Sequence, residues 1–362
     1  MNPRRLPVET LEAILEHTTK NEQLALCTSS KLLHDLAIRI LYRDLRFTRS
    51  SQLVQCFRVL KYKQGHALAV MTLNIATVSD TQHLRAYFRL IKDVLARLSR
   101  LKRLDLQQSD RHSERRYDIL DTCVFPRLHT LIFDHMDGLY AAKFLGRHPN
   151  IATLSISSMR DEHPARDFRY IQLPNLRAYI SRTRILPSWL SRSTSLEHLA
   201  LFYDYQHPKT EKTFEALSHT HAKRLDLILA GWNLECCGVL SRTLPTLKAI
   251  GIQNMGGNQT VKISHFIENF SASLPTFNRL EEFTLADSAS VSTPLTFSVL
   301  DREHELVQEW YCMCPELKMC EFGAGVTWTL ESRLHRFAWV PVPAAGDVAS
   351  TLLVDQWQLE SS

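Results

Sequence analysis

The residues whose spacing most resembles that of a metal site are cysteines near the C-terminal end. Cys312 and Cys314 are separated by one residue, and Cys320 and His304 lie nearby in the sequence. Thiolate and imidazole groups bind zinc, but structural zinc sites use other spacings, most often C-x2–4-C pairs. Cys320 also falls where the surrounding sequence pattern requires a small buried apolar side chain. We therefore expect no metal site and no cofactor.

Catalytic motifs are missing from the sequence as well. It contains no GxSxG, GxxxxGK[ST], HExxH or CxxC, the patterns that present an activated serine, a phosphate-binding loop, a zinc hydrolase centre or a redox dithiol. The basic run 97–116 could contact phosphates, but it has no interleaved aromatic side chains for base stacking. We expect a protein that performs no covalent chemistry, and we do not expect nucleic acid as a partner.

Composition is that of an ordinary globular protein. The chain has 362 residues, of which 44% are hydrophobic and 22% charged, enough for one extended domain or two compact ones. No apolar run is long enough to span a membrane or to serve as a secretory signal. The eight cysteines follow no framework spacing, which suits free thiols in a reducing compartment. The expected location is cytoplasmic, nuclear or both, with no membrane partner.

A short phrase recurs from about residue 67: an apolar residue, two variable residues, an apolar residue, one variable residue and a last apolar residue. It begins at Val70, Leu101, Leu128, Ile151, Leu176, Leu196, Ala222, Leu247, Leu280 and Leu317. A weaker eleventh copy, LHRFAW from Leu334, would end the series. The alternating apolar positions predict strands with one buried face, and helical patterns separate them.

This strand–helix alternation at a period of mostly 20 to 33 residues resembles leucine-rich repeats. The resemblance implies an α/β fold, a solenoid of about ten repeats with parallel strands on the concave face and helices outside. The family's asparagine at the ninth repeat position is absent, so we expect an irregular arrangement. A doubly wound α/β domain is the competing architecture, but no glycine loop follows the first predicted strand, at 76–79.

Residues 6–47 form a helical segment with more apolar side chains than so short a piece can bury by itself. Pro7 suits a first helical position, and apolar stripes follow at helical spacing. Leu6-Pro7, Leu11 with Ile14-Leu15, Leu24 with Leu26-Cys27, and Leu41-Tyr42 before Arg46-Phe47 make the segment resemble an F-box. That resemblance implies binding to the Skp-type adaptor of a cullin–RING ubiquitin ligase, with the rest of the chain selecting the substrate.

Two sets of candidate binding residues follow. Those implied for the adaptor are Leu6, Pro7, Leu11, Ile14, Leu15, Leu24, Leu33, Leu36 and Leu41. Those for a protein client are outward-facing strand positions that join charges to an aromatic ring, namely Arg103, Asp105, Asp134, Arg182, His198, Phe202, Arg224 and Asp226. A solvated face that binds nothing is the alternative for the second set.

The expected organisation is an F-box-like domain at 1–47, a connecting helix at 48–66, repeats at 67–340, and a cap or tail at 341–362. The predicted function is that of a substrate-recognition subunit of an SCF-type cullin–RING ubiquitin ligase. The alternative is a non-catalytic scaffold whose N-terminal helices only cap the repeats.

Overall fold

The computed structural model describes residues 6–76, 85–107, 119–120, 122–136, 138–159, 171–181, 190–203, 214–215, 217–256, 261–288, 295–322, 326–333, 336–343 and 348–360. The chain divides into two compact units, Met1–Leu176 and Arg177–Ser362. No helix in these ranges is both long enough and apolar enough to cross a membrane.

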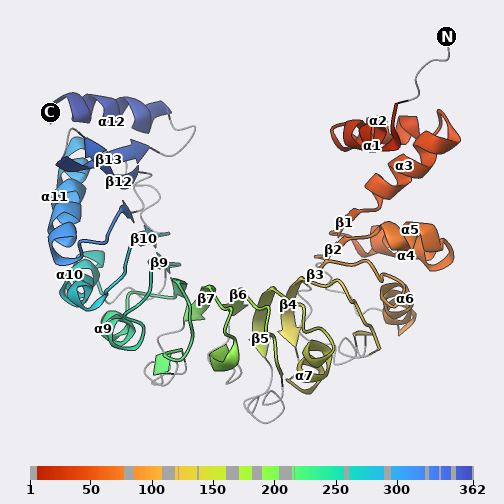
Figure 1. The fold of residues 1–362 in the computed structure, drawn as a ribbon, viewed down its shortest axis with the longest axis horizontal. Helices are drawn as coiled ribbons and strands as arrows, with labels where there is room; N and C mark the ends of the chain where they lie inside the picture. Colours follow the sequence, from red (N-terminus) through yellow and green to blue (C-terminus); the bar gives the residue numbers. More distant parts are fainter. Residues whose placement is uncertain are drawn as a thin grey trace. The chain divides into compact units, whose positions relative to one another are not determined.

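The first unit opens with three short helices and continues as a run of parallel strands. Its elements are α1 (Val8–Glu16), α2 (Lys20–Leu26), α3 (Lys31–Leu41), β1 (Asp44–Phe47), α4 (Ser50–Tyr62), α5 (Gln64–Ala69), β2 (Thr72–Ile75), α6 (Arg85–Leu95), β3 (Arg103–Leu106), β4 (Thr130–Met136), α7 (Gly138–Gly146) and β5 (Thr153–Met159). Strands β1 to β5 pair in chain order, all parallel. Helices α4 to α7 lie on one side of them (Figure 1).

The second unit repeats this plan and changes it at the end. Its elements are β6 (Ala178–Ser181), a 3-10 turn (Leu190–Arg192), β7 (His198–Tyr203), β8 (Arg224–Leu229), α9 (Leu234–Thr243), β9 (Ala249–Asn254), α10 (Ile263–Ser273), a second 3-10 turn (Leu274–Thr276), β10 (Glu282–Asp287), α11 (Phe297–Met313), β11 (Met319–Glu321), β12 (Val326–Arg333), β13 (Arg336–Pro343) and α12 (Val348–Glu360). Strands β6 to β11 are parallel neighbours, and α9 to α11 lie along one side of them (Figure 1).

The recurring apolar phrase sets the register between strands. Its second apolar position pairs Leu73, Leu104, Leu131 and Leu154 in the first unit, and Tyr179, Leu199, Leu225, Ile250, Phe283 and Cys320 in the second. All ten side chains are at most 1% exposed. Each strand thus contributes one side chain to a buried apolar row, and burial of this row stabilises the fold. The predicted α/β class with stacked units of leucine-rich-repeat type is confirmed.

The first strand was missed by the sequence prediction. Tyr42, Leu45 and Phe47 fit the recurring phrase, but they were assigned to the end of the helical segment. In the structure Asp44–Phe47 is β1, and Leu45 and Phe47 pair with Leu73 and Ile75 of β2. The helical segment therefore ends at Leu41, and the strand series begins directly after it.

The end of the strand series also differs from expectation. Leu334-x-x-Phe337-x-Trp339 matches the phrase, but this segment does not add a further parallel strand. Strands β12 and β13 form an antiparallel hairpin on β11, and Phe337 is 66% exposed where the repeat would bury it. Helix α12 packs on β13 and α11, with Val354 and Trp357 buried.

One asparagine does bridge two repeat units, although not at the ninth position. Asn254 at the end of β9 is fully buried, and its amide nitrogen donates to Asp287 at the end of β10. Its side-chain oxygen accepts from the main-chain nitrogen of Gly256, which adopts a positive φ of 73°. A left-handed turn of this kind favours glycine.

Candidate interaction surfaces

The three N-terminal helices build a small apolar core of their own. Leu15 of α1 and Leu36 and Ala37 of α3 are buried together. Four partly buried side chains pack against them, Leu11, Leu26, Cys27 and Ile40. This core is covered by the chain itself and needs no partner.

Polar groups fix how these helices follow one another. Thr19 caps α2 in a capping box: its hydroxyl accepts from the main-chain nitrogen of Glu22, whose carboxylate accepts from the main-chain nitrogen of Thr19. The buried Gln23 amide donates to the carbonyl oxygens of Leu15 and Thr18, at 2.9 and 3.2 Å. Thr19 in the short link between α1 and α2 therefore starts α2.

The nine predicted adaptor-binding residues divide by burial. Leu6, Pro7, Ile14 and Leu24 are exposed, and Leu11, Leu33 and Leu41 are half-buried. Leu15 and Leu36 are 1% and 2% exposed. We correct the prediction that Leu15 and Leu36 contact an adaptor directly, because other side chains of the helices already cover them. The apolar stripe on which they lie serves the core.

Exposed apolar side chains are nevertheless concentrated in this segment. Among the described residues, ten large hydrophobic side chains are exposed, and five of them lie between residues 6 and 32: Leu6, Val8, Ile14, Leu24 and Leu32. Single exposed apolar residues are normal on a protein surface. Half of them within one short segment is a local surplus that the fold of this chain does not use.

The helical segment also contacts the first strand–helix units. Helix α3 packs on α5 and on β1, and Tyr42 lies with its ring centroid 4.8 Å from that of His66. The segment therefore covers one end of the first unit. This contact is what a capping role requires, and it is compatible with a partner on the remaining surface.

A charged network crosses the open side of the sheet in the second unit. His198 Nε2 on β7 lies 2.6 Å from Asp226 Oδ2 on β8, and Arg224 Nε donates to both oxygens of Asp226 at 3.1 and 3.2 Å. Arg224 also reaches Glu282 on β10, at 3.3 Å. Four side chains from three strands are thus held in one orientation.

Small residues on β9 leave space for this network. Asp226 pairs in register with Gly251 on β9. A Cβ built on Gly251 would lie 2.4 Å from Asp226 Oδ1. Arg224 pairs with Ala249, the residue that it crosses on its way to Glu282. Any larger side chain at these two β9 positions would occupy the space of the network.

Electrostatics keeps the centre of the network ionised. Partial burial raises the pKa of the Asp226 carboxyl, but hydrogen bonds from His198 and from the Arg224 guanidinium outweigh burial. The pKa therefore lies below its usual value of 3.8. At neutral pH Asp226 is a carboxylate that orients both neighbours.

A smaller group lies on the same side of the strands in the first unit. Asn74 on β2 donates to Asp105 on β3 at 3.0 Å, and Arg103 lies 3.7 Å from the same carboxylate. Asp105 is only 2% exposed, whereas the Arg103 side chain is 48% exposed. Of this pair, Arg103 is the side chain that a partner could reach.

Three client-site predictions remain. Phe202 is half-buried on β7. Asp134 lies in β4, but its side chain is outside the described part of the structure, and Arg182 lies outside the described residues. Sequence reasoning omitted Gly251 and left Glu282 out of the candidate set. A glycine at an outward strand position beside charged neighbours was the available signal for the first.

Exposed ion pairs line the start of several strands. Glu281 accepts from Lys248 and Lys318, at 2.5 and 2.9 Å, and Glu197 accepts from Lys223 at 2.9 Å. These hydrogen bonds from Lys248 and Lys318 lower the pKa of Glu281 to about 2. The pairs join consecutive repeat units at the surface, where solvent screens them.

The C-terminal cysteines differ in burial. Cys320 and Cys314 are buried and Cys312 is exposed, and burial raises the pKa of both buried thiols. Within the described ranges, no three His, Cys, Asp or Glu side chains are grouped as metal ligands. Cys320 instead occupies the core position that the repeat requires.

Comparisons with known proteins do not identify a partner or an activity for this chain. No protein-family model matches the sequence, and no curated protein matches it. Among solved structures, an internalin from Listeria monocytogenes is similar with a TM-score of 0.35 and 10% identity, over 76% of this chain and 82% of that one. What this chain binds must therefore be argued from its own surfaces.

Proposed function

We propose that this protein is the substrate-recognition subunit of an SCF-type cullin–RING ubiquitin ligase. In this proposal α1 to α3 bind a Skp-type adaptor, the open side of the strands binds a protein client, and other subunits transfer ubiquitin. The observation that supports it is the surplus of exposed apolar side chains between residues 6 and 32.

Burial of this surplus would contribute measurably to the affinity for a partner. Leu6, Ile14 and Leu24 are 49 to 56% exposed. Fully burying a side chain of this size from water contributes about 1.5–3 kcal/mol, so half as much area gives about 1 kcal/mol each. Together the three would contribute about 3 kcal/mol, which is roughly a hundredfold in affinity.

The network on β7, β8 and β10 supports the client half of the proposal. His198, Arg224 and Glu282 are between 36 and 45% exposed as side chains, and hydrogen bonds hold them in place. Pre-positioned polar groups lose little conformational freedom when a partner arrives, which favours specific binding. A client that reads this surface would carry complementary charges at matching spacing.

Co-purification tests the adaptor half. Leu6→Ala combined with Pro7→Ala removes exposed groups that no described contact of the core uses, so we expect the variant to fold normally and to recover less adaptor. Tyr62→Ala is the matched control, because Tyr62 is 81% exposed on α4, outside the segment. Equal adaptor recovery by the wild type and the double variant would count against the proposal.

A non-catalytic scaffold is the second candidate, and the packing of α3 on α5 and β1 favours it. Deleting residues 1–41 separates the two, because this cut keeps β1 paired with β2. If the helices only cap the strands, the remainder should aggregate and the full chain should not bind adaptor. If they are a docking module, the full chain should bind adaptor and the remainder should not, whether or not the remainder stays monomeric.

A further inference from the structure

Four exposed basic side chains lie at the edge of the first unit where β3 and β4 begin. Arg100 and Lys102 precede β3, and Arg127 and His129 precede β4. The His129 main-chain nitrogen donates to the Lys102 carbonyl oxygen at 2.8 Å, so the two segments run side by side. We call these four residues the basic edge.

The two arginines occupy equivalent positions in successive turns. The main-chain nitrogens of Leu101 and Leu128 close the same kind of turn, with hydrogen bonds of 3.1 and 3.0 Å, and Arg100 and Arg127 stand immediately before them. Because neighbouring strands are about 4.8 Å apart, the two arginines leave the backbone on the order of 5 Å from each other. Two guanidinium groups are thus presented together.

The corresponding row of the second unit is neutralised by ion pairs. Lys223 donates to Glu197 at 2.9 Å, and Lys248 and Lys318 donate to Glu281 at 2.5 and 2.9 Å. The main-chain hydrogen bonds that align these residues, 2.7 to 2.8 Å long, follow the same pattern as in the basic edge. This position of the repeat can therefore hold acids and bases that pair across units.

No acid takes part in this row in the first unit. Lys102 lies between Met71 and His129, with main-chain hydrogen bonds of 2.8 Å to each. In the described part of the chain, the side chains of Arg100, Lys102 and Arg127 make no hydrogen bond or ion pair with a carboxylate. The fold thus leaves three positive charges without a counter-charge.

The carboxylates closest in sequence are already engaged. Residues 85–107 contain seven basic and only two acidic residues, Asp93 and Asp105. Asp93 accepts from Lys61 at 2.8 Å, and Asp105, which is 2% exposed, accepts from Asn74 at 3.0 Å. The charge of the basic edge is therefore available to a molecule that binds from outside.

An apolar group belongs to the same surface. Val124 is 53% exposed and lies three residues before Arg127, and Pro126 between them is also exposed. Every described Phe, Tyr and Trp side chain between residues 85 and 159 is buried. Single-stranded nucleic acid stacks its bases on exposed aromatic rings, which this surface does not offer. Charges beside an exposed aliphatic side chain favour a peptide instead.

We propose that the basic edge binds an acidic segment of a partner protein, in which two or three carboxylates flank an apolar side chain. Arg100 and Arg127 each bind a carboxylate through their planar guanidinium groups, Lys102 binds a third, and the apolar side chain covers Val124. The edge is separate from the adaptor surface and from the network on β7, β8 and β10. The inference does not depend on the proposed ligase role.

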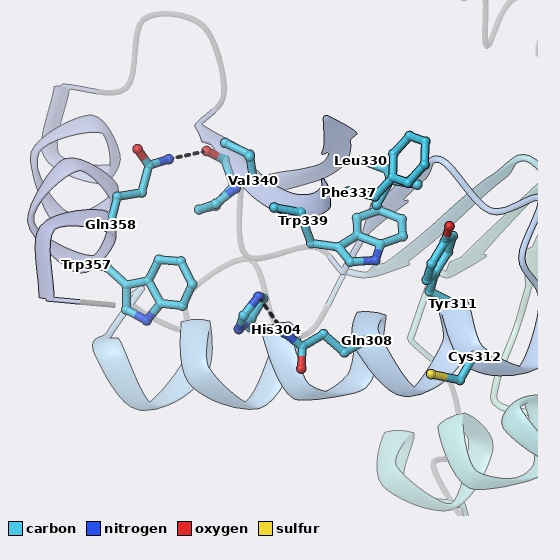
Figure 2. A pocket seen from close by; sticks show the side chains of 12 residues that line it. His304, Gln308, Tyr311, Cys312, Leu330, Phe337, Trp339, Val340, Trp357 and Gln358 are labelled. Carbon is cyan, nitrogen blue, oxygen red and sulfur yellow. Dashed lines mark hydrogen bonds between the residues drawn. The ribbon is translucent and has the colours of Figure 1, made fainter. Parts of the chain in front are cut away.

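The pocket near the C-terminal end would select a different ligand. It lies between α11, α12 and the β12–β13 hairpin, and its described lining includes Trp357 and Phe337 but no Lys or Arg (Figure 2). A peptide held there would be bound through apolar side chains and would gain nothing from carboxylates. The charge of a probe therefore separates the two places.

Matched probes test the partner chemistry on the full chain. The acidic probe is a fluorescein-labelled decapeptide with four glutamates around a central leucine, and the neutral probe has glutamine at each glutamate. Single-stranded and duplex DNA with the same label test the other class of anion. Fluorescence anisotropy should show binding of the acidic peptide that weakens as salt is added, and little binding of the others. Equal binding of the neutral peptide, tighter binding of either DNA, or no binding of the acidic peptide at millimolar concentration would overturn the proposal.

Charge reversal locates the contact. Arg127→Glu should weaken binding of the acidic peptide roughly three- to tenfold, because it removes one exposed ion pair and adds a repulsion. Arg279→Glu is the matched control, since Arg279 is exposed and precedes the first apolar residue of its own phrase, Leu280, in the second unit. It makes the same change in net charge and should leave the affinity unchanged. Equal losses in the two folded variants would contradict the assignment.

A measurement on the wild-type chain avoids dependence on variants. A water-soluble carbodiimide joins a carboxylate to an adjacent lysine amine as an amide and leaves as the urea. The acidic peptide should be cross-linked to Lys102, as read by peptide mass spectrometry, more than to Lys248 or Lys318, whose amines are held by Glu281. Cross-links spread evenly over the exposed lysines would contradict binding at this edge.

Discussion

Gly251→Ala should break the network on the strand face from underneath. A methyl group at this position would lie 2.4 Å from Asp226 Oδ1 and 3.3 Å from its Cγ. Contacts this close cannot persist, so the Asp226 carboxylate must shift from its position, which disturbs the geometry of its hydrogen bonds with His198 and Arg224. The backbone itself is no obstacle, because the φ of Gly251 is not in the left-handed region.

The expected magnitude follows from two opposing effects. Hydrogen bonds to charged groups contribute about 1.5–3 kcal/mol when buried, and we reduce this to about 1–2 kcal/mol for the set because these side chains are 27 to 40% exposed. Replacing glycine by alanine returns about 0.4–1 kcal/mol through the unfolded chain. The net result is a loss of about 1 kcal/mol.

Gly238→Ala is the matched control. Gly238 lies within α9, and a Cβ there meets nothing within 4 Å. This variant should gain about 0.5–1 kcal/mol from improved helix propensity. The two alanine variants should therefore differ by about 1–2 kcal/mol, with roughly 2–4 °C in thermal midpoint per kcal/mol for a unit of this size.

A double-mutant cycle isolates the cause. Thermal and urea unfolding, followed by circular dichroism, should show that Gly251→Ala destabilises the wild type but not the Asp226→Ala background. Equal effects of Gly251→Ala in both backgrounds, or a stability matching that of Gly238→Ala, would refute the reasoning.

Two further predictions concern packing and pH. Leu15→Ala should lower the stability of the N-terminal helices by about 2–5 kcal/mol, because it opens a cavity in their core. Ile14 is one residue earlier and exposed, so Ile14→Ala should change that stability by about 0.5 kcal/mol or less. Hydrogen exchange of α1 to α3 measures both effects, and equal effects would contradict the assigned burial. Hydrogen bonds from Lys248 and Lys318 depress the pKa of Glu281 from 4.5 to about 2, so its stabilising effect is complete above its usual pKa and disappears as the pH falls through the lowered one. The difference in thermal midpoint between the wild type and Glu281→Gln should therefore be constant above about pH 5 and vanish toward pH 2. A difference that stays constant down to pH 2 would contradict this ion-pair account.

The repeating strands could be predicted because each depends on a local pattern. Three apolar residues at fixed spacing fix which face of a strand is buried, and stacked copies then fix the register. The same pattern misled at the last copy, since three apolar residues do not distinguish a parallel from an antiparallel neighbour. Phe337 matches the phrase and yet faces solvent in the hairpin. At the other end, Tyr42-x-x-Leu45-x-Phe47 was hidden by its continuity with a helical pattern.

The surfaces were predictable only one residue at a time. His198 and Asp226 lie 28 positions apart, and their 2.6 Å contact depends on the length of the connection between β7 and β8. No local sequence pattern shows that a connection of this length brings the two side chains together. Likewise, helical spacing grouped Leu15 with Ile14 as candidate contacts, but only the packing of α1 on α3 decides which of them faces the core.

The central claim is that residues 6–32 present an apolar surface for an adaptor, and direct titration tests it most simply. A purified Skp-type adaptor should bind the full chain with a measurable heat, and the Leu6→Ser, Ile14→Ser, Leu24→Ser triple variant should bind roughly a hundredfold more weakly, from about 3 kcal/mol of lost burial. Its unfolding midpoint should match that of the wild type, because none of the three side chains belongs to the core. No binding by the wild-type chain, or equal binding by the two proteins, would contradict the account.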